Sequence, residues 1–165
     1  MTRSEVSVTD AASEVIALAR SSGLTVATAE SVTGGGVATA LTDVPGASDV
    51  VCGGIVAYTA DVKKTLLGVS EQTLRSAGVV SAEVASQMAT GAREACASDL
   101  ALATTGVAGP DPHGGREAGT VVVACATAGD VRVREFVASG NRHEIRLAAT
   151  VAALDMCVEV LRERT

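Results

Sequence analysis

Lysine is the residue type whose use in this chain most directly indicates chemistry. The sequence has 13 lysines and arginines together, and only Lys63 and Lys64 are lysines. Arginine stays protonated in proteins, whereas burial can turn a lysine amine into a base. An uncharged amine beside a serine hydroxyl is the simplest activated nucleophile for acyl transfer. The pair therefore predicts a reactive lysine; the alternative is that both side chains lie on a solvated helix face.

Ser48 and Tyr58 are hydroxyl side chains at the two ends of a predicted strand that precedes these lysines. Ser48 follows a Pro-Gly-Ala turn, and Tyr58, the one tyrosine, lies five residues before Lys63. A straight strand of about ten residues spans roughly 33 Å, which would keep Ser48 away from Lys63. Either a bend at Gly53-Gly54 folds Ser48 back, or a neighbouring subunit contributes it, or Ser48 is only a turn or cap residue.

The glycine-rich segment 30–36 follows another predicted strand and begins a short helix. Its glycines offer backbone N–H groups to an anion, and Ser31 and Thr33 add hydroxyl donors. Neither phosphate-binding pattern, GxxxxGK[ST] or GxGxxG opening a helix, occurs in the chain. The segment is thus an anion-site candidate or a tight turn with a helix cap. Glu30 ends a buried strand, so its carboxylate must be paired or hydrogen-bonded.

Two later features could also contact a polar ligand. The segment 104–110 follows a strand, and its hydroxyls and glycine N–H groups could bind a phosphate or an oxyanion. The alternative is that this segment is only a flexible surface loop. Arg142 and Arg146 lie one turn apart at the start of the last helix, where cations are unfavourable, so the pair indicates an anion nearby or is a surface coincidence. The sequence does not decide which arginine would contact a phosphate.

The elements that must position these residues alternate between strand and helix. The sequence predicts strands over 24–28, 50–58, 100–104, 120–127 and 131–137, with helices over 8–19, 37–41, 61–67, 70–76, 81–97 and 141–162. The last two strands form an antiparallel hairpin, and Asn141 with Glu144 forms a capping box. The predicted fold is a three-layer α/β/α sandwich whose mostly parallel, five-stranded sheet contains one antiparallel strand. Ligands gather beyond the carboxyl ends of such parallel strands, where the candidate segments lie.

Composition excludes several classes of protein. The 165 residues fit one domain, 1–165, and their net charge of −6 with only two aromatic residues disfavours binding to nucleic acid or an anionic membrane surface. The four cysteines are tens of residues apart and indicate buried apolar side chains, with no zinc pattern. No signal peptide or apolar membrane segment is evident, which predicts a cytoplasmic location.

Seven segments, taken together and in order over residues 8–162, resemble the CinA carboxy-terminal domain family, the nicotinamide-mononucleotide amidohydrolases. The segments are Thr28-Ala29-Glu30-Ser31-Val32-Thr33-Gly34-Gly35, Pro45-Gly46-Ala47-Ser48, Gly54 to Tyr58 with Lys63, Leu67-Gly68-Val69, Thr105-Gly106-Val107-Ala108-Gly109-Pro110, Gly119-Thr120-Val121 and Gly140-Asn141-Arg142. The first and fifth segments are the most specific.

The resemblance implies a cytoplasmic enzyme of pyridine-nucleotide salvage that needs no metal or cofactor. Such an enzyme hydrolyses the carboxamide of nicotinamide mononucleotide to nicotinic acid mononucleotide and ammonia, and is a homodimer or a higher homo-oligomer. By position, the catalytic residues fall on Ser48, Lys63 and Tyr58. The substrate-binding residues fall on Glu30, Ser31, Thr33, Gly34, Gly35, Thr105, Gly106, Gly109 and Arg142.

Some residues depart from the family pattern. Val32 replaces a common cysteine, Thr59-Ala60-Asp61-Val62 replaces Ser-Asn-Glu-Ala, and Arg116-Glu117 replaces a common Lys-Pro. The last change could alter how the phosphate end of the substrate is held. The amino-terminal domain of longer CinA proteins has no counterpart in the sequence, so the chain resembles the stand-alone form.

The resulting hypothesis is that uncharged Lys63 takes the Ser48 proton, directly or through Tyr58, and that Ser48 attacks the carboxamide carbon. Backbone N–H groups of the glycine-rich loops would stabilise the oxyanion, and Arg142 would hold the phosphate. Two alternatives remain. One is a nucleotide-binding module without catalysis, regulatory in competence or DNA damage, and the other is an amidase for a different small carboxamide.

Overall fold

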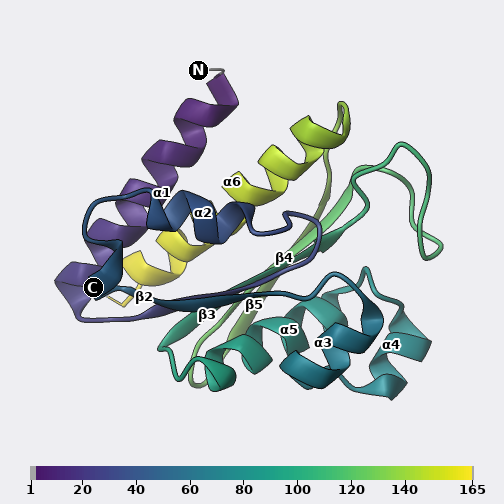
Figure 1. The fold of residues 1–165 in the computed structure, drawn as a ribbon, viewed down its shortest axis with the longest axis horizontal. Coiled ribbons are helices and arrows are strands. Elements are labelled where there is room, and N and C mark those ends of the chain that lie inside the picture. Colours follow the sequence, from purple (N-terminus) through teal and green to yellow (C-terminus); the bar gives the residue numbers. More distant parts are fainter. Residues whose placement is uncertain (1–2, 165) are drawn as a thin grey trace.

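Five strands form one sheet in the computed structural model, which describes residues 3–164 (Figure 1). Their bounds are β1 (Val26–Glu30), β2 (Val51–Val56), β3 (Leu100–Gly106), β4 (Thr120–Ala126) and β5 (Val131–Val137). The spatial order is β2-β1-β3-β4-β5; β1 pairs in parallel with β2 and β3, whereas β4 runs antiparallel to both of its neighbours. The predicted mixed sheet with one reversed strand is confirmed.

Helices cover both faces of this sheet, as the three-layer prediction requires (Figure 1). On one face lie α1 (Arg3–Ser22), α2 (Gly36–Thr42) and α6 (Arg142–Arg162), and on the other lie α3 (Ala60–Leu67), α4 (Glu71–Ala77) and α5 (Ala82–Ala95). A single 3-10 turn, Ala47–Asp49, precedes β2. Because β1, β2, β3 and β5 run the same way, their carboxyl ends meet at one edge of the sheet.

The two faces of the sheet carry side chains of different size. Facing α1 and α6, the central strands present larger groups such as Val26, Leu100 and Leu102. Facing α5, β1 and β3 present alanines, among them Ala27 and Ala103. Strands buried on both faces carry apolar residues without a polar alternation, as β1, β3 and β4 do. The small side chains let the α5 layer pack close to the sheet.

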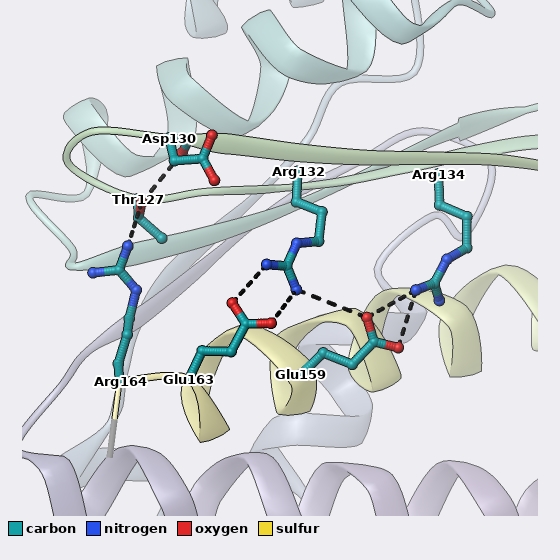
Figure 2. Close-up of polar contacts among 7 residues, drawn as sticks. All are labelled: Thr127, Asp130, Arg132, Arg134, Glu159, Glu163 and Arg164. Atoms are coloured by element: carbon teal, nitrogen blue, oxygen red, sulfur yellow. Dashed lines mark hydrogen bonds and ion pairs between the residues drawn. The ribbon is translucent and has the colours of Figure 1, made fainter.

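Ion pairs fasten α6 to the edge strand β5, as Figure 2 shows. Arg132 makes a two-pronged contact with Glu163, with distances of 2.6 and 3.0 Å, and Arg134 contacts both carboxylate oxygens of Glu159 at 2.8 and 3.0 Å. Exposed pairs stabilise a fold by less than about 1 kcal/mol each, so their main effect is on the placement of the helix. They fix the direction of α6, whose other end reaches the functional edge of the sheet.

The start of α6 confirms the predicted capping box. The Asn141 side chain accepts hydrogen bonds from the backbone N–H groups of His143 and Glu144, and the Glu144 carboxylate accepts one from the Asn141 N–H at 2.7 Å. Such reciprocal bonds satisfy N–H groups that a helix start leaves unpaired. They place Arg142 in the first turn of a well-defined helix.

The strand β2 differs from its prediction in length and in the position of its irregularity. It covers six residues, Val51–Val56, and the register of its pairing with β1 shifts at Cys52, one residue before the predicted Gly53-Gly54 bend. Beyond the shift, β2 stays paired with β1 up to Val56. The irregularity therefore adds a residue without reversing the chain.

The cysteines are less uniformly buried than predicted. All four are free; Cys125 and Cys157 are buried, Cys96 is half-buried, and Cys52 is exposed because it lies on an edge strand. Within the part of the chain that the structure describes, no helix has the length and apolar character needed to cross a membrane.

Gly91 lets α5 approach the end of α3, and we predict that Gly91→Ala destabilises the protein. A Cβ at this position would lie 1.9 Å from the carbonyl oxygen of Leu67, so one of the two helices would have to move. Overpacking of this kind costs about 1–3 kcal/mol, which exceeds the gain from replacing a helical glycine. Urea unfolding measures the loss. Gly129→Ala, where nothing lies within 4 Å, is the control, and equal stability of the two variants would contradict the packing argument.

Candidate active site

The amine of Lys63 lies inside the protein, although a lysine side chain is rarely buried. Lys63 is 2% exposed, and its Nζ lies 2.7 Å from the carbonyl oxygen of Ala57 and 2.9 Å from Oγ of Ser31. Among the described residues, no carboxylate forms an ion pair with it. Thr59 and Gly68 cap the two ends of α3, which carries the residue. The predicted buried lysine is therefore Lys63, and Lys64 is the solvated member of the pair.

Burial changes the acid–base chemistry of this amine. Removing it from water disfavours the charged form and lowers the pKa of Lys63 from the usual 10.5 to about 8. Roughly a tenth of the amine is then uncharged at pH 7 and about half at pH 8, far more than for a lysine in water. An uncharged amine donates to the carbonyl of Ala57 and keeps a lone pair that can accept the Ser31 hydroxyl proton. The geometry is that of a serine hydroxyl beside a base.

Ser31 owes its position to the end of β1. It is the first residue after the strand, it is 8% exposed, and its backbone N–H donates to the carbonyl of Thr104 on β3 at 2.9 Å. Lys63 follows the end of β2, the neighbour of β1 in the sheet. Two parallel strands thus deliver the hydroxyl and the amine to the same edge.

The carboxylate of Glu30 shapes the turn that follows Ser31. It is buried and accepts hydrogen bonds from the backbone N–H groups of Gly35, Val37 and Ala38 at 2.8–3.0 Å, and from the Thr33 hydroxyl at 2.6 Å. These contacts supply the partners that a buried acid needs. The start of α2 is therefore occupied by an acid of the chain itself.

Arg146 of α6 holds the same turn from its outer side. Its Nε donates to the carbonyl of Val32 at 3.2 Å, and its second guanidinium nitrogen donates to the carbonyl of Thr33 at 2.7 Å. Gly34 adopts φ +58°, and a Cβ there would lie 3.4 Å from the same guanidinium. The turn that follows Ser31 is thus held by hydrogen bonds to two side chains, the Glu30 carboxylate and the Arg146 guanidinium.

A pocket of about 590 Å³ opens over the Ser31–Lys63 contact. Its size is within the range of small-molecule sites. Predicted site residues that line it are Ser31, Tyr58, Lys63, Thr105, Gly106 and Arg142. Val32, Val107 and Ala108 also line it and belong to the candidate segments 30–36 and 104–110, and Thr59 and Ala60 lie between Tyr58 and Lys63. The lining residues outside these segments are Val79, Val80, Asp111, Pro112 and His113.

Arg142 and Tyr58 form one wall of the pocket. The guanidinium of Arg142 donates to Oη of Tyr58 at 2.8 Å and to the carbonyl of Gly109 at 3.0 Å. Tyr58 is 57% exposed, and its hydroxyl makes no hydrogen bond with Ser31 or Lys63 in the described residues. Of the two arginines, Arg142 lines the pocket, and Arg146 binds the backbone beside it.

Ser48 is not brought to Lys63 within one chain, which corrects the idea that a bend folds it back. It is exposed in the 3-10 turn before β2, whereas Lys63 follows the opposite end of that strand. The strand alone spans about 17 Å, and its irregularity at Cys52 does not turn the chain. Only a second copy of the chain could bring a Ser48 hydroxyl to this pocket.

Five residues predicted to bind substrate do not line the pocket. Glu30, Thr33, Gly34 and Gly35 make up the cap and turn described above, and Gly109 contributes its carbonyl to Arg142. The physical reason is that the N–H groups at the start of α2, taken as free for a substrate anion, are used by the Glu30 carboxylate. Thr105, in turn, lines the pocket while its hydroxyl donates to the Val79 carbonyl at 2.8 Å.

The partnership of Ser31 with Lys63 is the main feature that sequence reasoning missed. The signal was present, because Ser31 lies three residues and Lys63 five residues beyond the ends of strands that were expected to be parallel and consecutive in the chain. Strand order was needed to recognise it, and 32 residues separate the two side chains. No cluster of metal-ligating side chains occurs among the described residues.

A family model and individual relatives of known sequence point to the same protein family. The model of the CinA C-terminal domain matches residues 8–161. A CinA-like protein of Geotalea daltonii is 46% identical over 142 residues, which cover 86% of this chain and 34% of that protein. The chain spans about a third of the length of the curated relatives that it matches.

Solved structures agree with the fold over most of the chain. The crystal structure of the competence/damage inducible protein CihA from Agrobacterium tumefaciens superposes with a TM-score of 0.89 and 40% identity, covering 94% of this chain and 96% of that one. A protein of the competence-damaged protein (CinA) superfamily from Escherichia coli gives a TM-score of 0.90 with 31% identity, covering 93% and 90%.

The lowered pKa of Lys63 predicts how stability depends on pH. Below about pH 8 the amine is charged in both states, and folding bears the cost of burying that charge. Between about pH 8 and 10.5 the unfolded chain binds more protons than the folded one, so the free energy of unfolding rises with pH. Relative to Lys63→Met, the wild type should gain about 2 kcal/mol between pH 7 and pH 9.5.

Urea unfolding at the two pH values measures this difference. Lys64→Met is the matched control, because Lys64 lies on the same helix with its side chain about half exposed, so removing it should leave the wild-type pH dependence intact. Parallel pH profiles for the wild type and Lys63→Met would show that burial does not destabilise the charged amine.

Proposed function

The chain belongs to the CinA C-terminal domain family, and from this membership and the site geometry we propose that it hydrolyses the carboxamide of nicotinamide mononucleotide to nicotinic acid mononucleotide and ammonia. The observation that carries the proposal is the 2.9 Å contact between Ser31 Oγ and the buried Nζ of Lys63 beneath a pocket. That contact supports hydrolysis of an amide through a covalent serine intermediate. The proposed setting is pyridine-nucleotide salvage in the cytoplasm.

In the proposed mechanism Ser31 is the nucleophile and Lys63 is the general base. The uncharged amine takes the Ser31 proton as Oγ bonds to the carboxamide carbon, which gives a tetrahedral oxyanion. Collapse breaks the carbon–nitrogen bond, and the Lys63 ammonium gives its proton to the leaving nitrogen, so that ammonia departs. Water then attacks the ester while Lys63 accepts its proton, and the proton returns to Oγ as the ester bond breaks.

Backbone groups of the pocket wall can stabilise the oxyanion. Val32 and Ala108 both line the pocket, and neither backbone N–H donates a hydrogen bond within residues 3–164. We assign the oxyanion contacts to these two groups, because fixed N–H donors need no reorganisation during the reaction. Val32 directly follows the nucleophile, and Ala108 lies in the loop after β3.

Arg142 is proposed to bind the phosphate of the substrate. The guanidinium has five N–H donors, of which the contacts with Tyr58 and Gly109 use two, so donors remain for an anion. In this arrangement Tyr58 is proposed to orient Arg142 and to contact the substrate. A role of Tyr58 as a proton relay would require its hydroxyl to reach Ser31 or Lys63, and it is hydrogen-bonded to neither within residues 3–164.

A homodimer or a higher homo-oligomer is the proposed assembly, and it is the one way in which Ser48 could join the site. A neighbouring copy would have to place its own Ser48 hydroxyl over the pocket. The direct contact of Lys63 with Ser31 makes this contribution unnecessary for the chemistry. Substituting Ser31 and Ser48 one at a time therefore distinguishes between the two candidate nucleophiles.

Substitution of the two serines and the lysine tests the mechanism. We expect Ser31→Ala and Lys63→Ala to lower kcat by at least about 100-fold, because each removes a group that moves a proton or forms the covalent bond. Ser48→Ala is the matched control and should stay within about twofold of the wild type. The measurements are ammonia release and mass-spectrometric detection of nicotinic acid mononucleotide.

Three results would count against the proposal. Wild-type turnover by Ser31→Ala would remove Ser31 as nucleophile, and a large loss in Ser48→Ala would support a site shared between subunits. Tight binding of the mononucleotide without product formation by the wild type would favour a regulatory binding module. Equal turnover of free nicotinamide would indicate an amidase that ignores the phosphate.

A further inference from the structure

The pocket has a closed end and an open mouth. At the closed end lie Ser31 and Lys63, which are 8% and 2% exposed, whereas Asp111, Pro112 and His113 line the pocket and are exposed. A substrate whose reacting carbon reaches Ser31 must extend its other end toward these three residues. They belong to the loop between β3 and β4, which projects at the right of Figure 1.

His113 is held by a small hairpin within that loop. The backbone groups of His113 and Arg116 exchange two hydrogen bonds of 3.0 Å, and Gly114 and Gly115 between them have φ +58° and +75°. Two successive residues with positive φ form the tight turn that favours glycine at both positions. The backbone on either side of the turn therefore has a defined course.

Contacts on two sides hold this hairpin against the rest of the protein. Arg116 forms an ion pair with Glu135 of β5. On the other side, a Cβ on Gly114 would lie 3.4 Å from the Val79 side chain, which itself lines the pocket. The hairpin thus forms a fixed wall of the pocket mouth, and the Arg116 charge is already paired.

The charges around the pocket favour an anion with several acceptor oxygens. Lys63, Arg142 and His113 are the basic residues of its lining, and Asp111 is the one acid among the described lining residues. Lys63 is committed to Ser31 at the closed end, which leaves Arg142 and His113 for the outer part of a ligand. A phosphate monoester offers three oxygens, more than one arginine fork normally satisfies.

We propose that His113 donates a hydrogen bond from its imidazole to the phosphate of the substrate and, together with Arg142, makes the site selective for a phosphorylated nucleotide over its nucleoside. This inference rests on the proposed function for the identity of the substrate. It assigns a specificity residue to a loop whose sequence, Asp111-Pro112-His113, was not among the predicted site segments. The catalytic chemistry at Ser31 does not need it.

The test compares nicotinamide mononucleotide with nicotinamide riboside as substrates for the wild type, His113→Ala and His113→Gln. We expect the ratio of kcat/KM for the nucleotide to that for the riboside to fall about 10-fold in His113→Ala, mostly through KM, because one hydrogen bond to a charged group is lost. His113→Gln, which keeps an N–H donor, should recover part of the ratio. An unchanged ratio, or an equal fall for both substrates, would overturn the proposal.

His143→Ala is the matched control, because His143 is the one other histidine, is exposed, and does not line the pocket. It should leave the substrate ratio unchanged, and a fall equal to that of His113→Ala would also overturn the assignment.

A binding measurement separates failure of this inference from failure of the proposed function. Proton NMR of the wild type contains ring signals from only two histidines, which the two alanine variants assign. The Ser31→Ala variant lacks the proposed nucleophile, so ligands can be added to it without reaction. In this variant the His113 signal should shift with the mononucleotide but not with the riboside, and the His143 signal should not shift. If the wild type releases no ammonia, this result still supports the phosphate contact. Equal shifts with both ligands, or no shift with either, overturn it.

Discussion

The cost of burying the Lys63 amine is the physical constraint on which the site depends. Desolvation disfavours its charge, and no carboxylate among the described residues compensates, so the pKa falls to about 8. An ion-paired lysine would stay protonated and could not accept a proton from Ser31. The fold accepts this destabilisation because the amine still has two hydrogen-bond partners, the Ala57 carbonyl and the Ser31 hydroxyl. Burial of Nζ of Lys63 therefore lowers the stability of the protein and, at the same time, makes the amine available as a base.

The rest of the architecture serves to hold two side chains together at the edge of the sheet. Two adjacent parallel strands end just before Ser31 and shortly before Lys63. The small side chains facing α5 allow the helical layer around α3 to approach the sheet. The turn after Ser31 is fixed by the Glu30 carboxylate and by Arg146 of α6. The contacts between α6 and β5 keep that helix in place (Figure 2). Polar interactions thus determine the site, and apolar packing determines the layers.

The sequence predicted the layers and strands because local patterns encode them. Apolar runs without alternation marked the buried strands, a short turn marked the β4–β5 hairpin, and Asn141 with Glu144 marked the start of α6. It also predicted an unusual lysine, from composition alone. It did not identify the partner of that lysine, because the Ser31–Lys63 contact depends on which strands are neighbours. Nor could it show that the glycine-rich helix start is filled by Glu30, since free and occupied N–H groups have the same sequence pattern.

The central claim is that burial lowers the pKa of Lys63 to about 8, which makes the uncharged amine accessible near neutral pH, and nuclear magnetic resonance of lysine side chains measures this pKa directly. The chain has only two lysines, so protein labelled with ¹³C at the lysine ε carbon gives two signals, and Lys63→Arg assigns them. The account predicts that the Lys63 signal titrates near pH 8 in the folded protein. Titration near 10.5, the usual lysine value, would mean that almost no uncharged amine is present near neutral pH and would contradict the account.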